Sequence, residues 1–296
     1  MLKRIRQRLP LSEHIVQWCL MCTAFLTVLL LIGIFLFLFL SSLRAFREIT
    51  PSEFLLGNSW NPVSYHRASW GIGSLLQGTL LVSTTALLFA APLGLFTAIY
   101  LSEIARPLVR EILKPTIEMI AGIPSVVLGL LGLLFFAPLI AKTFHLSNGL
   151  NALTAGILVG IAALPTIASV CEDALSGVTR RYREASLALG ATRWATIRRV
   201  VLPAAHHGIA AAIMLGLGRI IGETMIVLMV AGNSLAPPRS LFSPARPITA
   251  TIAIEIKETI IGSTHWHSLF ALGLILFLLT FLVNFVADFL IHRRTL

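Results

Sequence analysis

Six apolar stretches, each long enough to cross a lipid bilayer, dominate the pattern of hydrophobic and polar positions along the chain. A hydrocarbon core of about 30 Å is crossed by about 20 helical residues. The stretches lie at about 15–43, 75–101, 114–140, 150–172, 209–232 and 267–291. This pattern predicts an all-α membrane protein with six transmembrane helices in a single domain, residues 15–292.

The first apolar stretch follows a cluster of basic residues and so resembles a signal sequence. Its apolar run is too long for one, and no small-residue cleavage site follows it. We therefore expect a retained membrane helix after a short N-terminal segment, residues 1–14. Composition agrees, because a mean hydropathy of +0.88 with 56% hydrophobic and only 12% charged residues would leave a soluble protein with a largely apolar surface.

Lysine and arginine are unevenly divided between the two sides of the predicted membrane, and this bias sets orientation. With the N-terminus inside, the larger share falls on residues 1–14, the loops around 106–114 and 173–208, and the tail 293–296. We therefore expect both termini and the loop 173–208 to be cytoplasmic. The net charge of +10 does not indicate a nucleic-acid partner, because the basic residues lie in separate short loops rather than in one patch laced with aromatics.

The polar segment 184–203 reads EASLALGATRWATIRRVVLP. Good helix formers precede Gly190, a glycine suits the turn that ends a helix, and Pro203 stops a second helix. The segment 180–203, called the knob below, is therefore predicted to form two short helices at an angle. Its arginines suit docking to a protein surface or to anionic headgroups; they are Arg180, Arg181, Arg183, Arg193, Arg198 and Arg199. Charge alone also fits an ordinary cytoplasmic loop, whereas the ordered spacing favours a docking element.

Two charged residues, Arg219 and Glu223, lie within the fifth apolar stretch. A charge near the bilayer centre costs about 2.5 to 3.5 kcal/mol, so such residues usually face the bundle interior and mark an ion or substrate path. Their spacing of four would place them on one helical face, where they can pair. A guanidinium matches an oxyanion, and a nearby carboxylate limits its grip. A purely structural ion pair fits the same spacing.

Glycine and proline interrupt several of the predicted helices. Residues 122–125 break the third stretch, and Pro92 and Pro165 lie within the second and fourth. Broken membrane helices are tolerated where the freed backbone groups face protein or a water-filled cavity. The breaks are compatible with a transport route, and equally with helices that merely pack. Residues 251–261, outside the six stretches, are moderately apolar and suit a short helix at the outer interface.

Together these motifs resemble the permeases of phosphate-specific (Pst-type) ABC importers over nearly the whole chain. The matching segments are GTL at 78–80, PLG at 92–94, AIYLSE at 98–103, AGIPSVV at 121–127, the knob motif at 184–203 and GRIIGETM at 218–225. The knob departs from the family pattern by Ser186 for an alanine and Val200 for an isoleucine. WNP at 60–62 and GN at 232–233 favour the C-type over the A-type permease, although Leu128 stands where the C-type often has an aromatic.

The resemblance implies a permease of the type I ABC importer fold in the cytoplasmic (inner) membrane of a bacterium. It implies an A-type sister permease as heterodimer partner, a dimer of ATP-binding subunits, and an extracytoplasmic phosphate-binding protein. The family's intramembrane charges carry over to Arg219 and Glu223, and we place Thr224 and Ser125 beside them on the substrate pathway. The roles of the ATPase coupling loop carry over to Glu184, Ala185, Gly190 and Pro203.

Catalytic functions find little support in the sequence. The chain has no G-x-x-x-x-G-K-[ST] phosphate loop, so we expect it to bind no cofactor itself, with ATP-Mg held by the partner subunit. No histidine or cysteine group has the composition of a metal site. A secondary transporter remains an alternative that would need coupling acids in the spans, for which only Glu118 and Glu223 qualify. Charge alone does not separate phosphate from molybdate, tungstate or sulfate.

Overall fold

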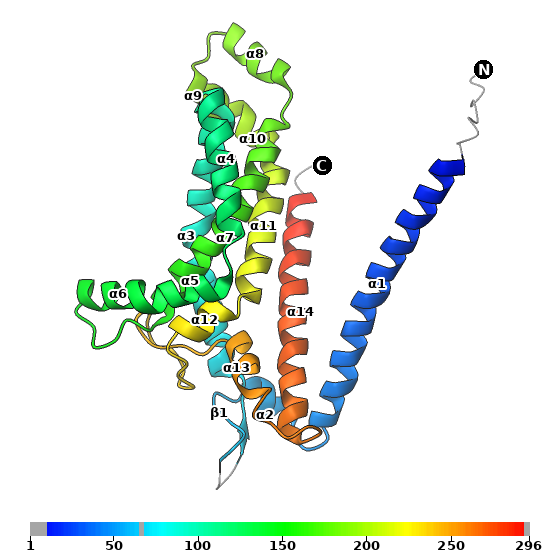
Figure 1. Ribbon diagram of the computed structural model, residues 1–296, viewed down its shortest axis with the longest axis vertical. Coiled ribbons are helices and arrows are strands. Elements are labelled where there is room, and N and C mark those ends of the chain that lie inside the picture. Colours follow the sequence, from blue (N-terminus) through cyan, green and yellow to red (C-terminus); the bar gives the residue numbers. More distant parts are fainter. Residues whose placement is uncertain (1–10, 65–67, 293–296) are drawn as a thin grey trace.

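The protein forms an elongated helical bundle, seen here in a computed structural model that describes residues 11–64 and 68–292. Figure 1 shows α8 to α10 at one end of the bundle and β1, α2 and α13 at the other. The longer helices are α1 (Leu11–Ala45), α3 (Gly73–Ile99), α4 (Pro107–Ala121), α7 (Ala152–Ser176), α11 (His206–Gly222) and α14 (Thr264–His292). The shorter ones are α2 (Pro51–Leu56), α5 (Ser125–Leu131), α6 (Ala137–Thr143), α8 (Arg180–Ala188), α9 (Arg193–Thr196), α10 (Leu202–Ala204), α12 (Met225–Val230) and α13 (Ile248–Glu255).

Three π-helical turns and one small hairpin complete the described elements. The π-helical turns are Tyr100–Ile104, Gly132–Phe136 and Ile197–Val201. The hairpin pairs β1 (Trp60–Asn61) with β2 (Ser69–Trp70) in antiparallel register, Trp60 opposite Trp70. Residues 1–10 of the expected N-terminal segment, and the expected tail 293–296, lie outside the described residues.

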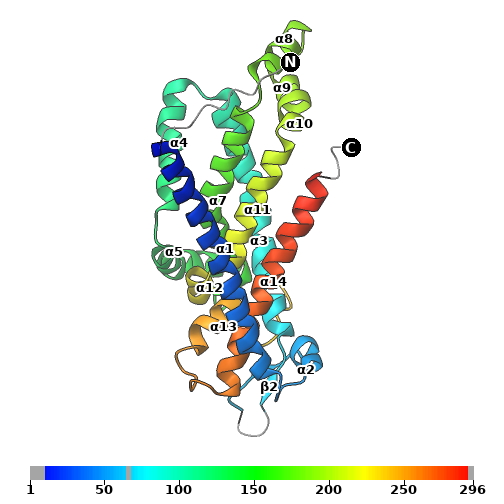
Figure 2. The same cartoon turned by 90° about the vertical axis from the view of Figure 1, so that its right-hand side faces the viewer.

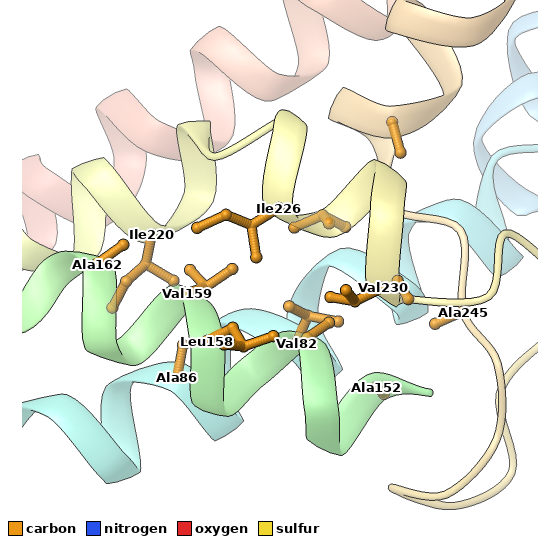
Figure 3. Packing of buried hydrophobic residues seen from close by; sticks show 14 of the residues in the cluster. Val82, Ala86, Ala152, Leu158, Val159, Ala162, Ile220, Ile226, Val230 and Ala245 are labelled. Atoms are coloured by element: carbon orange, nitrogen blue, oxygen red, sulfur yellow. The ribbon is translucent and has the colours of Figure 1, made fainter. Parts of the chain in front are cut away.

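The core of the bundle is the packing of α7 against α3, the most extensive helix contact in the molecule. Small residues allow this approach: a Cβ on Gly156 would lie 2.6 Å from the Thr85 side chain, and one on Gly160 would lie 3.0 Å from the Ala86 carbonyl. Close backbone contact through small residues is typical of membrane helices. Figure 3 shows the resulting cluster, in which Leu158 and Val159 of α7 meet side chains from α3, α11 and α12.

Helix α1 lies at the edge of the bundle and contacts mainly α14 (Figures 1 and 2). Aromatic pairs join the two helices, with ring centroids 5.7 Å apart for Phe35 and Phe277 and 5.4 Å apart for Phe37 and Phe270. None of the most apolar part of α1 is buried within this chain. Its apolar surface therefore suits a lipid environment, as expected for a retained membrane helix.

The expected all-α membrane fold is present, but two of the expected spans differ from the structure. Within the described residues, five helical segments are long and apolar enough to cross a membrane, and a sixth is counted if the two helices 193–204 and 206–222, bent by 70°, form one span. The expected span 114–140 is divided, because α4 ends at Ala121 and the apolar segment is Ser125–Thr143. The expected span 209–232 is divided as well, because α11 ends at Gly222.

Candidate functional site

The chain leaves helical geometry at Glu223, between α11 and α12. The backbone of Glu223 is extended, with φ −68° and ψ 128°. Its side chain turns onto the start of α12, where one carboxylate oxygen accepts the backbone N–H groups of Thr224 and Met225, both at 3.1 Å, and of Ile226 at 3.3 Å. These N–H groups have no partner inside the helix, so the carboxylate serves as an N-terminal cap.

The predicted pairing of Arg219 with Glu223 is wrong for this conformation. The spacing of four places two side chains on one face only while the helix continues, and here it ends between them. Within residues 11–64 and 68–292, no acidic side chain forms an ion pair with Arg219. Its exposed guanidinium instead donates one 3.3 Å hydrogen bond, to the hydroxyl of Thr166 on α7. No described residue therefore neutralises the positive charge of Arg219, and this charge suits an anionic ligand.

A second helix break lies between α4 and α5, and the helix that follows it, α5, packs on α12. A Cβ on Gly129 of α5 would lie 2.7 Å from the Met229 sulfur and 3.4 Å from the Met225 carbonyl. The short helices α5 and α12 are therefore side by side and run across the direction of α7 (Figure 1). Discontinuous helices that meet within the membrane are typical of substrate sites in transporters.

Ser125 and Thr224 begin the two short helices. Ser125 is the first residue of α5, and Thr224 immediately precedes α12, with its hydroxyl donating to the Gly222 carbonyl at 3.2 Å. Among the described residues, no hydrogen bond joins Ser125 to Arg219 or to Thr224. The structure thus brings the short helices that follow the two breaks, α5 and α12, into contact. The role of Ser125 and Thr224 in the substrate pathway stays a prediction.

The knob has the two-helix geometry that its sequence predicts. Helix α8 ends in a Schellman turn: Gly190 has φ +83°, its N–H bonds the Leu187 carbonyl at 2.9 Å, and the Ala191 N–H bonds the Ser186 carbonyl at 3.2 Å. The Thr192 hydroxyl then caps α9 by accepting from the Ala195 N–H at 3.2 Å. The requirement for a left-handed residue at Gly190 is confirmed.

Ser186, one of the two departures from the family pattern, has a structural role. Its hydroxyl lies 2.9 Å from that of Thr196, which is buried, so one hydrogen bond joins α8 to the helix that follows. Pro203 lies in α10, and the chain bends at Ala205 before α11 begins. The knob is therefore a compact element with fixed internal geometry rather than a flexible loop.

Arg183 is the arginine of the knob that faces inward. Its guanidinium pairs with Glu103 at 2.6 Å and donates to the Leu175 carbonyl at 2.8 Å. This contact holds the knob to the ends of α3 and α7. The sequence places Arg183 among the arginines of a predicted docking surface, and the structure shows that it is not part of one. Its partner Glu103 lies 80 residues away and was not identified from the sequence.

The outer surface of the knob is unusually apolar for a polar segment. Tyr182 and Trp194 are 60% and 58% exposed, and Leu189, beside the Schellman turn, is 89% exposed. Glu184 is exposed and pairs with Arg180 at 3.0 Å within α8, and Ala185 is exposed beside it. Exposed apolar side chains among charges are typical of a protein-binding surface.

A buried carboxylate that the sequence analysis did not single out joins α7 to α4. Glu172 is fully buried and binds both Arg110 and Lys114, the latter at 2.6 Å. Lys114 also contacts Asp173 at 3.0 Å, and the Ser176 hydroxyl donates to Glu172 at 2.8 Å. Two signals in the sequence could have indicated this cluster. Glu172 and Asp173 end an apolar stretch, and Arg110 and Lys114 are spaced by four residues, as on one face of a helix. This cluster fixes α4 to the last turns of α7.

Replacing Glu172 by glutamine is expected to lower the stability of the detergent-solubilised protein by about 2 kcal/mol, because the buried network loses its negative charge and one of its two acceptor oxygens, while both cations keep part of their contact with solvent. The matched control is Asp173→Asn, which removes a carboxylate that is 66% exposed. Thermal unfolding followed by tryptophan fluorescence compares the two. Equal melting temperatures for the two variants would contradict the structural role of Glu172.

The long apolar helices, the two helix breaks and the compact knob at one end of the bundle are features of a membrane transport subunit. The chain belongs to the family of binding-protein-dependent transport system inner membrane components, whose model matches residues 90–295.

Particular relatives are phosphate transporter subunits and a related permease. The chain is 38% identical to the phosphate transport system permease protein PstC of Mesorhizobium japonicum, over 97% of this chain and 92% of that protein. It is 35% identical to the probable ABC transporter permease protein YqgH of Bacillus subtilis, over 98% and 94% of the two chains. The family resemblance seen in the sequence is confirmed.

Solved structures of ABC importers share the fold. A bacterial alginate ABC transporter bound to its alginate-loaded periplasmic protein gives a TM-score of 0.63 at 17% identity, covering 96% of this chain and 98% of that one. The inward-facing MetNI methionine transporter gives 0.57 at 20% identity, covering 83% and 98%. At these identities the likeness concerns the fold alone, and it confirms the predicted importer-permease architecture.

Proposed function

We propose that this chain is the C-type permease subunit of an ABC importer that carries inorganic phosphate inward across the bacterial cytoplasmic membrane. The observation that carries the proposal is the similarity to PstC proteins over almost the whole chain. Arg219 supports it, because a guanidinium that pairs with no acidic side chain of the described residues is suited to bind an oxyanion. Its partners in this scheme are an A-type sister permease, two ATP-binding subunits and an extracytoplasmic phosphate-binding protein.

The knob supplies the mechanical step in this scheme. ATP-Mg is bound and hydrolysed by the partner subunits, and the apolar surface around Leu189 and Trp194 docks to them. Because Arg183 and Glu103 tie the knob to α3 and α7, motion of the docked partner is passed to the bundle. The helices on either side of the two breaks then re-orient, and the anion near Arg219 moves inward.

Uptake of labelled phosphate by the complete complex in proteoliposomes tests the proposal. We expect ATP-dependent accumulation that excess phosphate abolishes and excess sulfate or molybdate leaves nearly unchanged. Inhibition by sulfate, molybdate or tungstate instead would assign another oxyanion to the same permease. Accumulation driven by an ion gradient without ATP would indicate a secondary transporter.

The proposed orientation makes a separate prediction. Single cysteines at Arg193, in the knob, and at Ser64, beside the hairpin, are expected to react with a membrane-impermeant maleimide from opposite sides, the first from the cytoplasm and the second from outside. Arg193 begins α9, Ser64 follows β1, and α9 and β1 lie at opposite ends of the bundle (Figure 1). The native cysteines are first replaced by serine. Labelling of both sites from one side would rule out this orientation.

A further inference from the structure

A pocket of about 590 Å³ opens at the end of the bundle opposite the knob. The hairpin residue Asn61, helix α13 and the loop 256–263 form its walls, with Leu235 and His265 completing them. Helix α13 was expected at 251–261 along the outer interface, but it spans Ile248–Glu255 and is largely buried, because its threonines and Glu255 find partners inside the protein. The pocket is therefore backed by a rigid core element.

The charged residues deep in this pocket neutralise one another. Glu255, which is buried, accepts from the Trp60 indole at 3.0 Å and from His265 at 2.8 Å, and it pairs with Arg246 at 2.9 Å. Among the described residues, the Nε of Arg246 has no hydrogen-bond partner, but this atom is buried, so a ligand in the pocket does not reach it. Glu255 and Arg246 thus give the wall of the pocket its shape rather than a free charge.

The mouth of the pocket is acidic and apolar. Glu258 lines it and is exposed, and its carboxylate has no hydrogen-bond or ion-pair partner among the residues that the structure describes. Ile260 beside it is 80% exposed, and Ile261 is 82% exposed. Large aliphatic side chains around a carboxylate that forms no ion pair are suited to contact a protein that presents a basic side chain within an apolar surface.

Helix α13 connects this pocket to the break at Glu223. Thr249, near its first residue, donates to the Glu223 carbonyl at 2.9 Å, whereas Glu255, its last residue, lies in the pocket wall. The Ile248 N–H also donates to the Thr79 hydroxyl at 3.0 Å, which fixes α13 to α3. A partner seated in the pocket would therefore contact the same helix that touches the proposed substrate pathway.

We propose that this pocket is the socket in which the extracytoplasmic binding protein inserts a lysine or arginine side chain, with Glu258 as its counter-charge and Ile260 as part of the apolar rim. The proposal rests on the proposed function, because it needs an importer served by a binding protein, but it does not depend on which oxyanion is carried. The pocket has ample room for such a side chain, and the rim supplies the surrounding contact.

Charge reversal at the mouth gives the first test, with the purified binding protein of the same importer and the complete complex in proteoliposomes. The concentration of binding protein that gives half-maximal ATPase activity is expected to rise about tenfold for Glu258→Lys, because like charges then meet at the contact. The control is Lys257→Glu, an exposed neighbour that does not line the pocket, for which a change below about twofold is expected. An unchanged value for Glu258→Lys would overturn the proposal.

A photo-crosslinking amino acid at Ile260 gives the second test and leaves Glu258 intact. It is expected to crosslink the binding protein, whereas the same group at Leu189, an equally exposed aliphatic position on the knob, is not. Crosslinks from Ile260 to phospholipid alone would show that the rim lies in the membrane interface and that the socket is wrong. Failure of phosphate uptake by the unaltered complex, with the Ile260 crosslink present, would remove the phosphate assignment and leave the socket standing.

Discussion

Replacing Arg219 by glutamine is expected to reduce phosphate uptake by about a hundredfold while the complex stays assembled. The loss corresponds to about 2.7 kcal/mol, the size of a charge-assisted contact to an anion. Assembly is expected to survive because Arg219 is exposed and, among the described residues, bonds only Thr166. Uptake in proteoliposomes and co-purification of the subunits measure the two effects. Thr166→Val removes that one bond and keeps the charge, so it should cost much less.

Variants at Glu223 separate its capping role from a role as counter-charge. If the carboxylate mainly caps α12, Glu223→Gln keeps an acceptor oxygen and most of the uptake, whereas Glu223→Ala loses the cap, worth about 1 kcal/mol, and displaces the helix. If it mainly balances Arg219 in another conformation, both variants fail equally. The double variant Arg219→Gln with Glu223→Gln is then decisive. Restored uptake in that variant would make both residues structural and overturn the pathway role of Arg219.

The contrast between Gly190 and Glu223 shows where sequence reasoning succeeds in this protein. The turn at Gly190 is encoded by neighbouring residues: helix formers before it, a glycine able to adopt positive φ, and Thr192 as the next cap. The pairing of Glu223 was inferred from helical spacing, and it failed because the helix ends one residue earlier. Whether a helix continues through a run of glycines and apolar residues depends on tertiary packing, here that of α12 on α5 and α7.

The buried charge clusters were beyond prediction for a different reason. Arg183 meets Glu103 across 80 residues, and Trp60 meets Glu255 across 195. A sequence shows that these polar and charged groups lie near apolar segments, but not which of them meet. The overall class was accessible because twenty-residue apolar runs specify membrane helices almost independently of context. The division of the expected span 114–140 could be predicted only in part. Residues 122–124 signal a break in the helix, but the transverse course of α5 depends on the helix against which it packs.

Replacing Gly190 by valine is expected to uncouple ATP hydrolysis from phosphate import. The left-handed conformation at φ +83° costs an L-residue about 1 to 2 kcal/mol, and more when the side chain is β-branched, so the Schellman turn would reopen and α8 would shift relative to α9. Space is not the obstacle, because a Cβ at this position would meet no atom within 4 Å. The number of phosphate ions imported per ATP hydrolysed measures coupling directly.

Two matched variants decide whether backbone conformation is the cause of this loss. Gly190→Asn is expected to retain most of the coupling, since asparagine tolerates positive φ, whereas Ala188→Val places the same valine on the exposed surface of α8 at a helical position and should be nearly neutral. If asparagine fails as badly as valine, the partner subunit needs the bare glycine surface for close contact. If valine itself transports normally, the knob does not couple the two subunits through this turn.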